Sequence, residues 1–258
     1  MGGRLICQLE VIRITQYLKD RQKEEGGFSF IPDLYPDIED TYFAIRTLQL
    51  VNYEVDRGKT LNYLKNVDWT HVGFPRTIYM LAYLYIHLNI EFPSPLISLL
   101  KMDWLKFQTL DVQFFSDEIQ KLLNKPMKLV ASPQFFLFSH HENLQALRKK
   151  VSILFNHNLD FERIEVIKWV RLCQNGDGGF GFYPGTTSFM ENTYCAIEIL
   201  SKLNSSPMKM DACQEYILNC QTKNGGFGRA PMSFPFIEST YHAVAGWLLL
   251  DSMRQKEN

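Results

Sequence analysis

Apolar residues recur at every third or fourth position in several stretches of the chain, which is the spacing of one buried face of an α-helix. Clear stretches lie at residues 5–21, 76–88 and 237–253. The most apolar runs, at 78–88 and 243–250, are too short and too often interrupted to span a bilayer. The pattern therefore predicts a helical protein without a transmembrane segment.

Three segments of the chain align without a gap and mark an internal repeat. Each contains Gly-Gly-Phe, at residues 26–28, 178–180 and 225–227. Counted from that Phe, a Gln lies six residues before, a Pro four after, a Glu eleven after, Thr-Tyr at thirteen and fourteen, and Ala at sixteen. So many coincidences in one register indicate a repeated structural unit.

Each unit is predicted to be two helices joined by a short connector. The first helix ends near the Gln, and Gly-Gly provides a backbone that accepts positive φ and turns sharply. The Phe packs back, the Pro fixes an extended connector, and the second helix begins just before the Glu. Ser188 and Glu191 form a capping-box pattern at one such start, and Pro36 and Pro235 take the place of Ser188 in the other two units.

Weaker units fill the space between the first and second Gly-Gly-Phe. One is visible at residues 72–75, followed by the helix predicted at 76–88, and another falls within about 112–160. Helix hairpins of this kind bury their faces only against their neighbours, so about five units predict an open solenoid or a closed ring. No polar capping repeat is visible, which favours closure. We therefore expect an all-α fold, a single α/α toroid of the α6/α6 barrel type that spans residues 1–258.

Composition and charge narrow the function classes. Aromatic residues make up 14% of the chain, enough to fill a core or to line an apolar pocket. The net charge of −1 gives no general attraction to nucleic acid or to an anionic membrane surface. The five Cys residues are scattered and form no CxxC pair, which is typical of reduced thiols. No signal peptide is evident, so we expect a cytoplasmic protein.

The second unit, GGFGFYPGTTSFMENTY at residues 178–194, resembles the repeat shared by protein prenyltransferase β subunits, squalene–hopene cyclases and class II diterpene cyclases. The resemblance implies inner helices wrapped by outer helices, with a deep apolar cavity that opens where the inner helices begin. It also implies an isoprenoid ligand such as a polyprenyl diphosphate, and a second helical subunit or a second copy of the chain as partner. Because one fold supports many reactions, the site residues must decide the chemistry.

The resemblance to class II cyclases assigns an acid cluster to the first unit. Those enzymes carry Asp-x-Asp-Asp-Thr at the start of an inner helix, where this chain has Asp37-Ile-Glu39-Asp40-Thr41. Glu39 stands in the place of the proton donor, and burial together with neighbouring acids raises a carboxyl pKa as that chemistry requires. Glu39, Asp37 and Asp40 are therefore the catalytic candidates for protonating an alkene, a step that needs no metal.

The resemblance to protein prenyltransferases implies a catalytic zinc held by Asp-x-Cys and a later His. The matching positions here are Glu191, Thr193 and Glu238, and Thr is a poor zinc ligand beside a Cys thiolate. Zinc is therefore disfavoured as a cofactor, Mg²⁺ is left open, and no metal ligand is assigned.

The candidates for substrate binding occupy the Tyr phase and the Glu phase of the repeat: Tyr42, Tyr194, Tyr241, Glu191, Glu238 and Arg76. Tyrosine rings offer their faces to a carbocation, and Arg76, like Arg229, offers a charge to a diphosphate. A structural interpretation is open for each. Carboxylates in the first turn of a helix accept backbone N–H groups and interact favourably with the helix dipole, and the tyrosines fit as packing residues.

Three functions remain open on these residues. The leading hypothesis is a class II-type terpene cyclase that protonates a polyprenyl substrate held in an aromatic cavity. The second is a divergent prenyltransferase that transfers a prenyl group from a polyprenyl diphosphate. The third is a non-catalytic toroid that binds lipid or protein. The first hypothesis leads because only the first unit has acidic companions beside its Glu.

Overall fold

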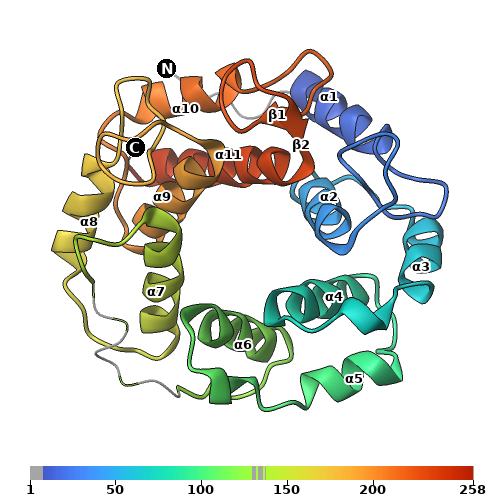
Figure 1. The fold of residues 1–258 in the computed structure, drawn as a ribbon. Coiled ribbons are helices and arrows are strands. Elements are labelled where there is room, and N and C mark those ends of the chain that lie inside the picture. The colour runs from blue at the N-terminus through green and yellow to red at the C-terminus, as the bar shows by residue number, and fades with distance from the viewer. Residues whose placement is uncertain (1–7, 130–131, 133–135, 137, 258) are drawn as a thin grey trace.

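The computed structural model describes residues 8–129, 132, 136 and 138–257, and they form a ring of helices in two layers (Figure 1). Six of the described helices form the inner layer: α2 (Ile38–Leu50), α4 (Pro75–His87), α6 (Leu110–Leu122), α7 (Leu144–Asn156), α9 (Met190–Lys202) and α11 (Ile237–Glu257). Five lie outside them: α1 (Gln8–Lys19), α3 (Arg57–Lys65), α5 (Ser94–Leu100), α8 (Arg163–Leu172) and α10 (Met210–Asn219). The remaining described elements are short: η1 (Trp69–His71), η2 (Trp104–Phe107), and the antiparallel pair β1 (Phe227–Gly228) and β2 (Pro235–Phe236).

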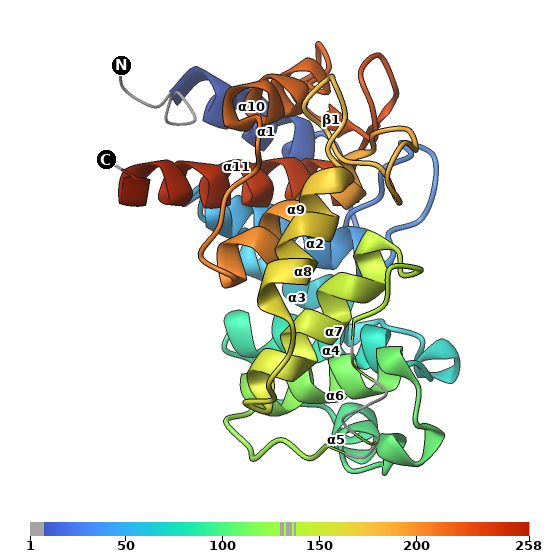
Figure 2. The same cartoon turned by 90° about the vertical axis from the view of Figure 1, so that its left-hand side faces the viewer.

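The inner helices form a closed ring. Each packs on the next one along the chain, and α11 packs on both α9 and α2, which joins the last helix to the first. All six run in the same direction, so their N-termini meet at one end of the barrel, which we call the mouth. Figure 2 shows the loops that precede α2, α9 and α11 at this end, away from the C-terminus. The all-α toroid predicted from the sequence is confirmed.

The Gly-Gly-Phe loops show how the two ends of the chain are brought together. The first Gly of each loop has positive φ, and a Cβ there would collide with the backbone of an outer helix. For Gly26 and Gly178 it is the outer helix that follows in the sequence, α3 and α10 respectively. For Gly225 it is α1, whose Arg13 carbonyl the Cβ would meet. The third loop therefore rests on the first helix, and this contact helps to close the ring.

Two polar side chains of the repeat hold each Gly-Gly-Phe loop. The amide of the Gln donates to the carbonyl of the first Gly over 3.1–3.2 Å. The Thr hydroxyl accepts the N–H of the Phe at 3.0 Å in all three units: Phe28 to Thr41, Phe180 to Thr193 and Phe227 to Thr240. Because a buried N–H group without a partner is costly, these bonds explain why Gln, Gly-Gly-Phe and Thr recur in one register.

The capping box predicted at one helix start does not form, although the helix begins just before the Glu as predicted. The hydroxyl of Ser188 donates to Asp177 at 2.9 Å and accepts from Asn175 at 2.8 Å. The N-cap residue of α9 is Phe189, which makes no side-chain cap bond. Ser188 therefore does not form the predicted capping box, because the preceding connector uses its hydroxyl to hold its own turn.

The irregular segment at 112–160, predicted to hold one weak unit, contributes to two inner helices, α6 and α7. These helices end as other inner helices do, with an asparagine of φ 50–54° placed two residues past the helix: Asn52, Asn89, Asn124, Asn158 and Asn204. After each Asn the next N–H bonds to a carbonyl five residues earlier, as Lys125 does to Gln120 at 2.8 Å. This Schellman-type ending identifies the weak units as members of the same ring.

The apolar core fills the space between the two helix layers. Fully buried side chains come from both layers, among them Tyr17 and Tyr216 outside and Ile45 and Leu81 inside. Each inner helix therefore turns one face to this core and leaves the other face for the barrel axis. Among the described residues, no helix is long and apolar enough to cross a bilayer.

Candidate functional site

The second residue of every inner helix is polar. These residues are Glu39, Arg76, Asp111, Gln145, Glu191 and Glu238. All six line the central cavity or a pocket beside it. Six helix N-termini converge at this mouth, and their free N–H groups and dipoles favour negative charge. The Glu phase of the repeat therefore faces the inside of the barrel, which the sequence alone left open.

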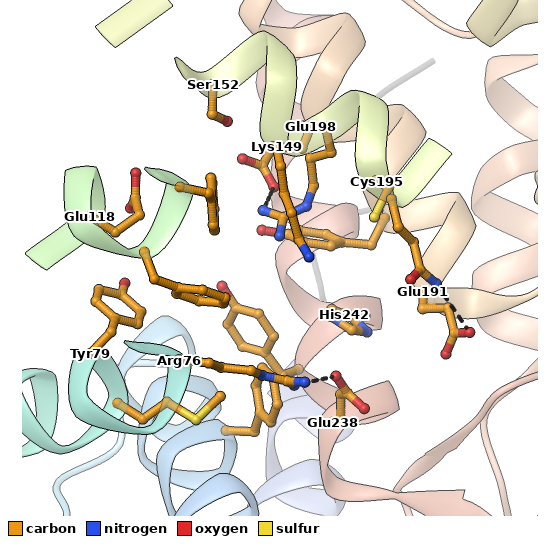
Figure 3. Close-up of a pocket in the computed structure, with 18 of the residues that line it drawn as sticks. Arg76, Tyr79, Glu118, Lys149, Ser152, Glu191, Cys195, Glu198, Glu238 and His242 are labelled. Carbon is orange, nitrogen blue, oxygen red and sulfur yellow. Dashed lines mark hydrogen bonds and ion pairs between the residues drawn. The ribbon is translucent and has the colours of Figure 1, made fainter. Parts of the chain in front are cut away.

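Two arginines tie the mouth carboxylates together. Arg76 on α4 bonds Glu39 on α2, and it also reaches Glu238 on α11 at 3.4 Å (Figure 3). Arg229, in the loop before α11, bonds Glu191 at 2.6 Å. Burial raises the pKa of Glu238 to about 7, an effect that the charge of Glu39 adds to and that of Arg76 opposes. The residues predicted at the Glu phase thus form ion pairs across the mouth.

The three candidates for acid catalysis lie together beside the mouth. Asp37 is the N-cap of α2 and accepts the N–H of Asp40 at 2.7 Å, while Asp40 accepts the N–H of Phe30 at 2.8 Å. With Glu39 they line a side pocket of about 410 Å³, which the rings of Phe30 and Phe236, 4.9 Å apart, also line. Burial raises the pKa of all three carboxyls, and for Asp40, where the charge of Asp37 adds to it, the value is about 7. The acid cluster therefore belongs to the side pocket and does not line the central cavity.

The central cavity runs inward from the mouth and has a volume of about 460 Å³. Aromatic rings from α2, α4, α6 and α11 form what we call the aromatic wall: Tyr42, Phe43, Tyr79, Phe114, Phe115 and Tyr241. Neighbouring rings contact one another, such as Phe43 with Tyr241 at 5.2 Å and Tyr79 with Phe115 at 6.0 Å between centroids. This wall contains two of the three tyrosines predicted to bind the substrate.

The opposite side of the cavity, formed by α7 and α9, is charged. Its members, which we call the charged wall, are Arg148, Lys149, Ser152, Glu198 and Lys202 (Figure 3). Glu198 accepts from Arg148 at 3.1 Å and from Lys202 at 2.6 Å. Burial favours the neutral form of Glu198, but the two cations outweigh it and lower its pKa to about 2. The wholly apolar cavity that the resemblance implied is therefore wrong, because this wall carries a network of ion pairs.

Tyr194, the third predicted tyrosine, lies where the two walls meet. Its ring stacks on His242 with centroids 4.8 Å apart and planes 19° from parallel. Burial, with the charge of Arg148, lowers the pKa of His242 to about 3, so this imidazole is neutral. The pair joins α9 to α11 at the cavity surface.

The positions that the resemblance assigns to zinc do not fit that metal. Thr193 is buried, and its hydroxyl accepts from Phe180 and donates to the carbonyl of Phe189 at 2.9 Å. Cys195 lines the cavity, but burial raises the pKa of its thiol to about 12, which disfavours the thiolate that zinc binds. In the part of the chain that the structure describes, no three His, Cys, Asp or Glu side chains are grouped to hold a metal.

The sequence interpretation missed several residues that line the cavity. Arg46 and Glu198 share one phase of the repeat, eighteen residues after the Phe, where the third unit has Ala245. When the units are compared up to two residues beyond the shared Ala, Arg46 and Glu198 stand out as charged positions on an inner face. Arg148 lies in α7, whose unit has no Gly-Gly-Phe, so no repeat signal marks it.

Comparison with known proteins agrees with this geometry. The family model of the prenyltransferase alpha-alpha toroid domain matches residues 6–80 and 98–258. The solved structure of Candida albicans protein geranylgeranyltransferase-I, complexed with GGPP, matches with a TM-score of 0.71 and 13% identity over 96% of this chain and 92% of that chain, a likeness of fold alone. A search of curated proteins finds no match. With most of its length matched by the family model and its inner and outer helices closed into one ring, the chain belongs to the prenyltransferase alpha-alpha toroid family.

Proposed function

We propose that the chain is a prenyltransferase-type enzyme that binds an isoprenoid diphosphate in its central cavity. The two-sided cavity carries this proposal, because the aromatic wall suits an isoprenoid chain and the cations around it suit a diphosphate. The volume of about 460 Å³ is that of an ordinary small-molecule site. The family and the GGPP bound by the C. albicans enzyme add support for isoprenoid chemistry.

In this reaction the C–O bond between the prenyl chain and the diphosphate breaks, and its electron pair leaves with the diphosphate. The ring faces of Phe115 and Tyr241 stabilise the allylic cation, and the cations of the cavity stabilise the charge that develops on the leaving group. The acceptor enters through the mouth and loses a proton as it bonds to the prenyl carbon. Glu238, with a pKa of about 7, is suited to take that proton near neutral pH.

A class II-type terpene cyclase is the second candidate, and the acid cluster in the side pocket favours it. Arg76 bonds Glu39 and opposes its protonation, whereas Asp40, with a pKa of about 7, keeps a proton on about half of the molecules at neutral pH. This alternative therefore moves the proton donor from Glu39 to Asp40, with Asp37 beside it. The non-catalytic interpretation loses its main structural argument, because the aromatic side chains leave the cavity open.

Calorimetric titration tests the first proposal. The protein is titrated with geranylgeranyl diphosphate and, separately, with geranylgeraniol, the alcohol of the same chain length. We expect the diphosphate to bind at least about 10-fold more tightly, because each charge-assisted hydrogen bond contributes about 1.5–3 kcal/mol. Equal affinities for the two ligands, or no binding of either, contradict the proposal.

Product analysis separates prenyl transfer from cyclisation. The protein and its Glu39→Gln and Asp40→Asn variants are incubated with geranylgeranyl diphosphate or squalene, with EDTA or with Mg²⁺, since the cofactor assignment is still a prediction. A cyclase gives cyclic products that Asp40→Asn abolishes. A product profile shared by the wild type and both variants rules the cyclase out. Size-exclusion chromatography of the same samples tests the predicted second subunit or second copy.

A further inference from the structure

Arg46 is a cation inside the barrel that has no carboxylate partner in the described part of the chain. Six cationic side chains line the central cavity, and five of them form ion pairs with carboxylates: Arg76, Lys121, Arg148, Lys149 and Lys202. The sixth, Arg46, forms no ion pair with any residue that the structure describes. Like the other five cations, Arg46 lies on an inner helix. It differs from them in the groups that surround its guanidinium.

Tyrosines surround Arg46 in place of carboxylates. Its Nη1 donates to the hydroxyl of Tyr42 at 2.7 Å, and its guanidinium carbon lies 4.9–5.6 Å from the ring centroids of Tyr42, Tyr83 and Tyr241. The hydroxyl of Tyr42 in turn donates to that of Tyr79, at a long 3.4 Å. Among the described residues, the Tyr42 hydroxyl is the one hydrogen-bond acceptor of the five N–H groups that a guanidinium carries.

The position of Arg46 separates it from the acidic mouth. It lies seven residues after Glu39 on the same helix, which places it about 10 Å deeper along the barrel at 1.5 Å per residue. Ring faces attract a cation and keep it in place, but they do not neutralise it, and a charge held away from water without a counter-ion is unfavourable. An anion that enters the cavity meets here a cation with which no carboxylate of residues 8–129, 132, 136 or 138–257 is paired.

We propose that Arg46, with the hydroxyls of Tyr42 and Tyr79, is an anion subsite that binds a phosphoryl oxygen. A guanidinium enclosed by ring faces still presents its N–H groups as a fork that matches a phosphoryl group. The identity of the full ligand, an isoprenoid diphosphate, rests on the proposed function, whereas the anion subsite rests on Arg46 and the tyrosines alone. Each of the other cations of the cavity is paired with a carboxylate, with Arg148 and Lys202 sharing Glu198, so Arg46 is the anchor.

The test is calorimetric titration with inorganic pyrophosphate, which has no prenyl chain. Wild type is compared with Arg46→Met, which removes the charge, and with Arg46→Lys, which keeps it. The matched control is Arg163→Met on α8, whose guanidinium carbon also lies over aromatic rings, 5.1 Å from Phe155 and 5.5 Å from Phe161, but outside the cavity. We expect pyrophosphate to bind about 10- to 100-fold more weakly to Arg46→Met, with part of the affinity kept in Arg46→Lys and all of it in the control.

Three results overturn the subsite: no saturable binding of pyrophosphate by the wild type, equal affinity in Arg46→Met, or binding of sodium octanoate, a carboxylate, in place of pyrophosphate. Circular dichroism shows whether Arg46→Met folds. If it does not, a crystal structure of the wild type with pyrophosphate decides, since an anion placed away from Arg46 contradicts the proposal. Geranylgeranyl diphosphate that binds equally to wild type and Arg46→Met counts against the subsite alone. Pyrophosphate binding without binding of the prenyl ligand counts against the proposed function alone.

Discussion

The two walls of the cavity are built on different helices of one parallel ring, and they hold their charges in opposite ways. On the charged wall, Glu198 lies between Arg148 and Lys202, and the three side chains satisfy one another. On the aromatic wall, Arg46 has ring faces and one hydroxyl around it but no carboxylate among the described residues. The charged wall therefore has more charged side chains, but they are paired with one another. The aromatic wall has Arg46, which no carboxylate of the described residues neutralises.

This difference separates structural charge from charge that is available to a ligand. Ion pairs within a wall fix neighbouring helices and compensate their own desolvation, so an incoming anion gains little there. A cation surrounded by ring faces, by contrast, gains a counter-ion when an anionic ligand binds beside it.

The largest effect is expected on the charged wall, in Glu198→Gln. This change leaves Arg148 and Lys202 without their shared carboxylate, and breaking a buried pair in this way costs about 3 kcal/mol of the free energy of unfolding. Urea denaturation measures it. The control is Glu165→Gln on α8, which breaks an exposed pair with Lys168 and should leave the midpoint unchanged. Equal midpoints for both variants would show that the charged wall is not held by its ion pairs.

The two acid groups of the site should respond to pH in opposite directions. The pKa of Glu198 is about 2, below its ordinary 4.5, so its stabilisation is complete above pH 4.5 and is lost as the pH falls toward 2. The pKa of Asp40 is about 7, above its ordinary 3.8, so the folded state binds the proton more tightly and stability falls as the pH rises from about 4 to 7.

Asp40→Asn should therefore remove about 3 kcal/mol of the loss of stability between pH 4 and 7, because the pKa of Asp40 lies about three units above its ordinary value. Part of the slope remains, because the pKa of Glu238 is also about 7. The measurement is the free energy of unfolding at a series of pH values. A variant with the slope of the wild type would show that Asp40 titrates normally in the folded protein.

On the aromatic wall, Phe115→Leu should weaken binding without unfolding the barrel. Leucine lacks the ring face that Phe115 presents to the cavity, which removes about 1 kcal/mol of interaction with an isoprenoid chain, or about 5-fold in affinity for geranylgeranyl diphosphate. The affinity for pyrophosphate should stay the same, since it has no chain. Titration of both ligands checks this, and an equal loss for both would mean that the change disturbs the whole cavity.

The smallest effect is expected for Lys149→Met. Lys149 bonds Asp111 at 2.6 Å, but Asp111 is 64% exposed, and pairs of this kind contribute less than about 1 kcal/mol. The melting temperature should change by no more than a few degrees. A loss as large as that of Glu198→Gln would mean that the whole charged wall acts as one network.

Much of the fold was accessible from the sequence because its signals are local. Gly-Gly-Phe, the Gln before it and the Thr at the start of the following helix lie close together in sequence and bond to one another, so the same residues recur at the same spacing wherever the loop recurs. The units without this loop were harder to recognise. Their remaining signal is the Asn that ends an inner helix, such as Asn124, and it becomes informative only when five helix ends are compared.

The site was less accessible, because its chemistry depends on which helices face one another. The sequence by itself determined that carboxylates recur at one phase and that acids surround Glu39. The tertiary structure decided that this acid cluster lines a side pocket, that Arg76 from another unit bonds Glu39, and that Glu198 meets Arg148 across two helices. It also shows that Arg46 faces tyrosines from three helices and, among the residues that the structure describes, no carboxylate. The reason is physical: a backbone motif is satisfied by residues close in sequence, whereas a charge is satisfied by its neighbours in space, and ring closure brings those neighbours together from distant parts of the chain.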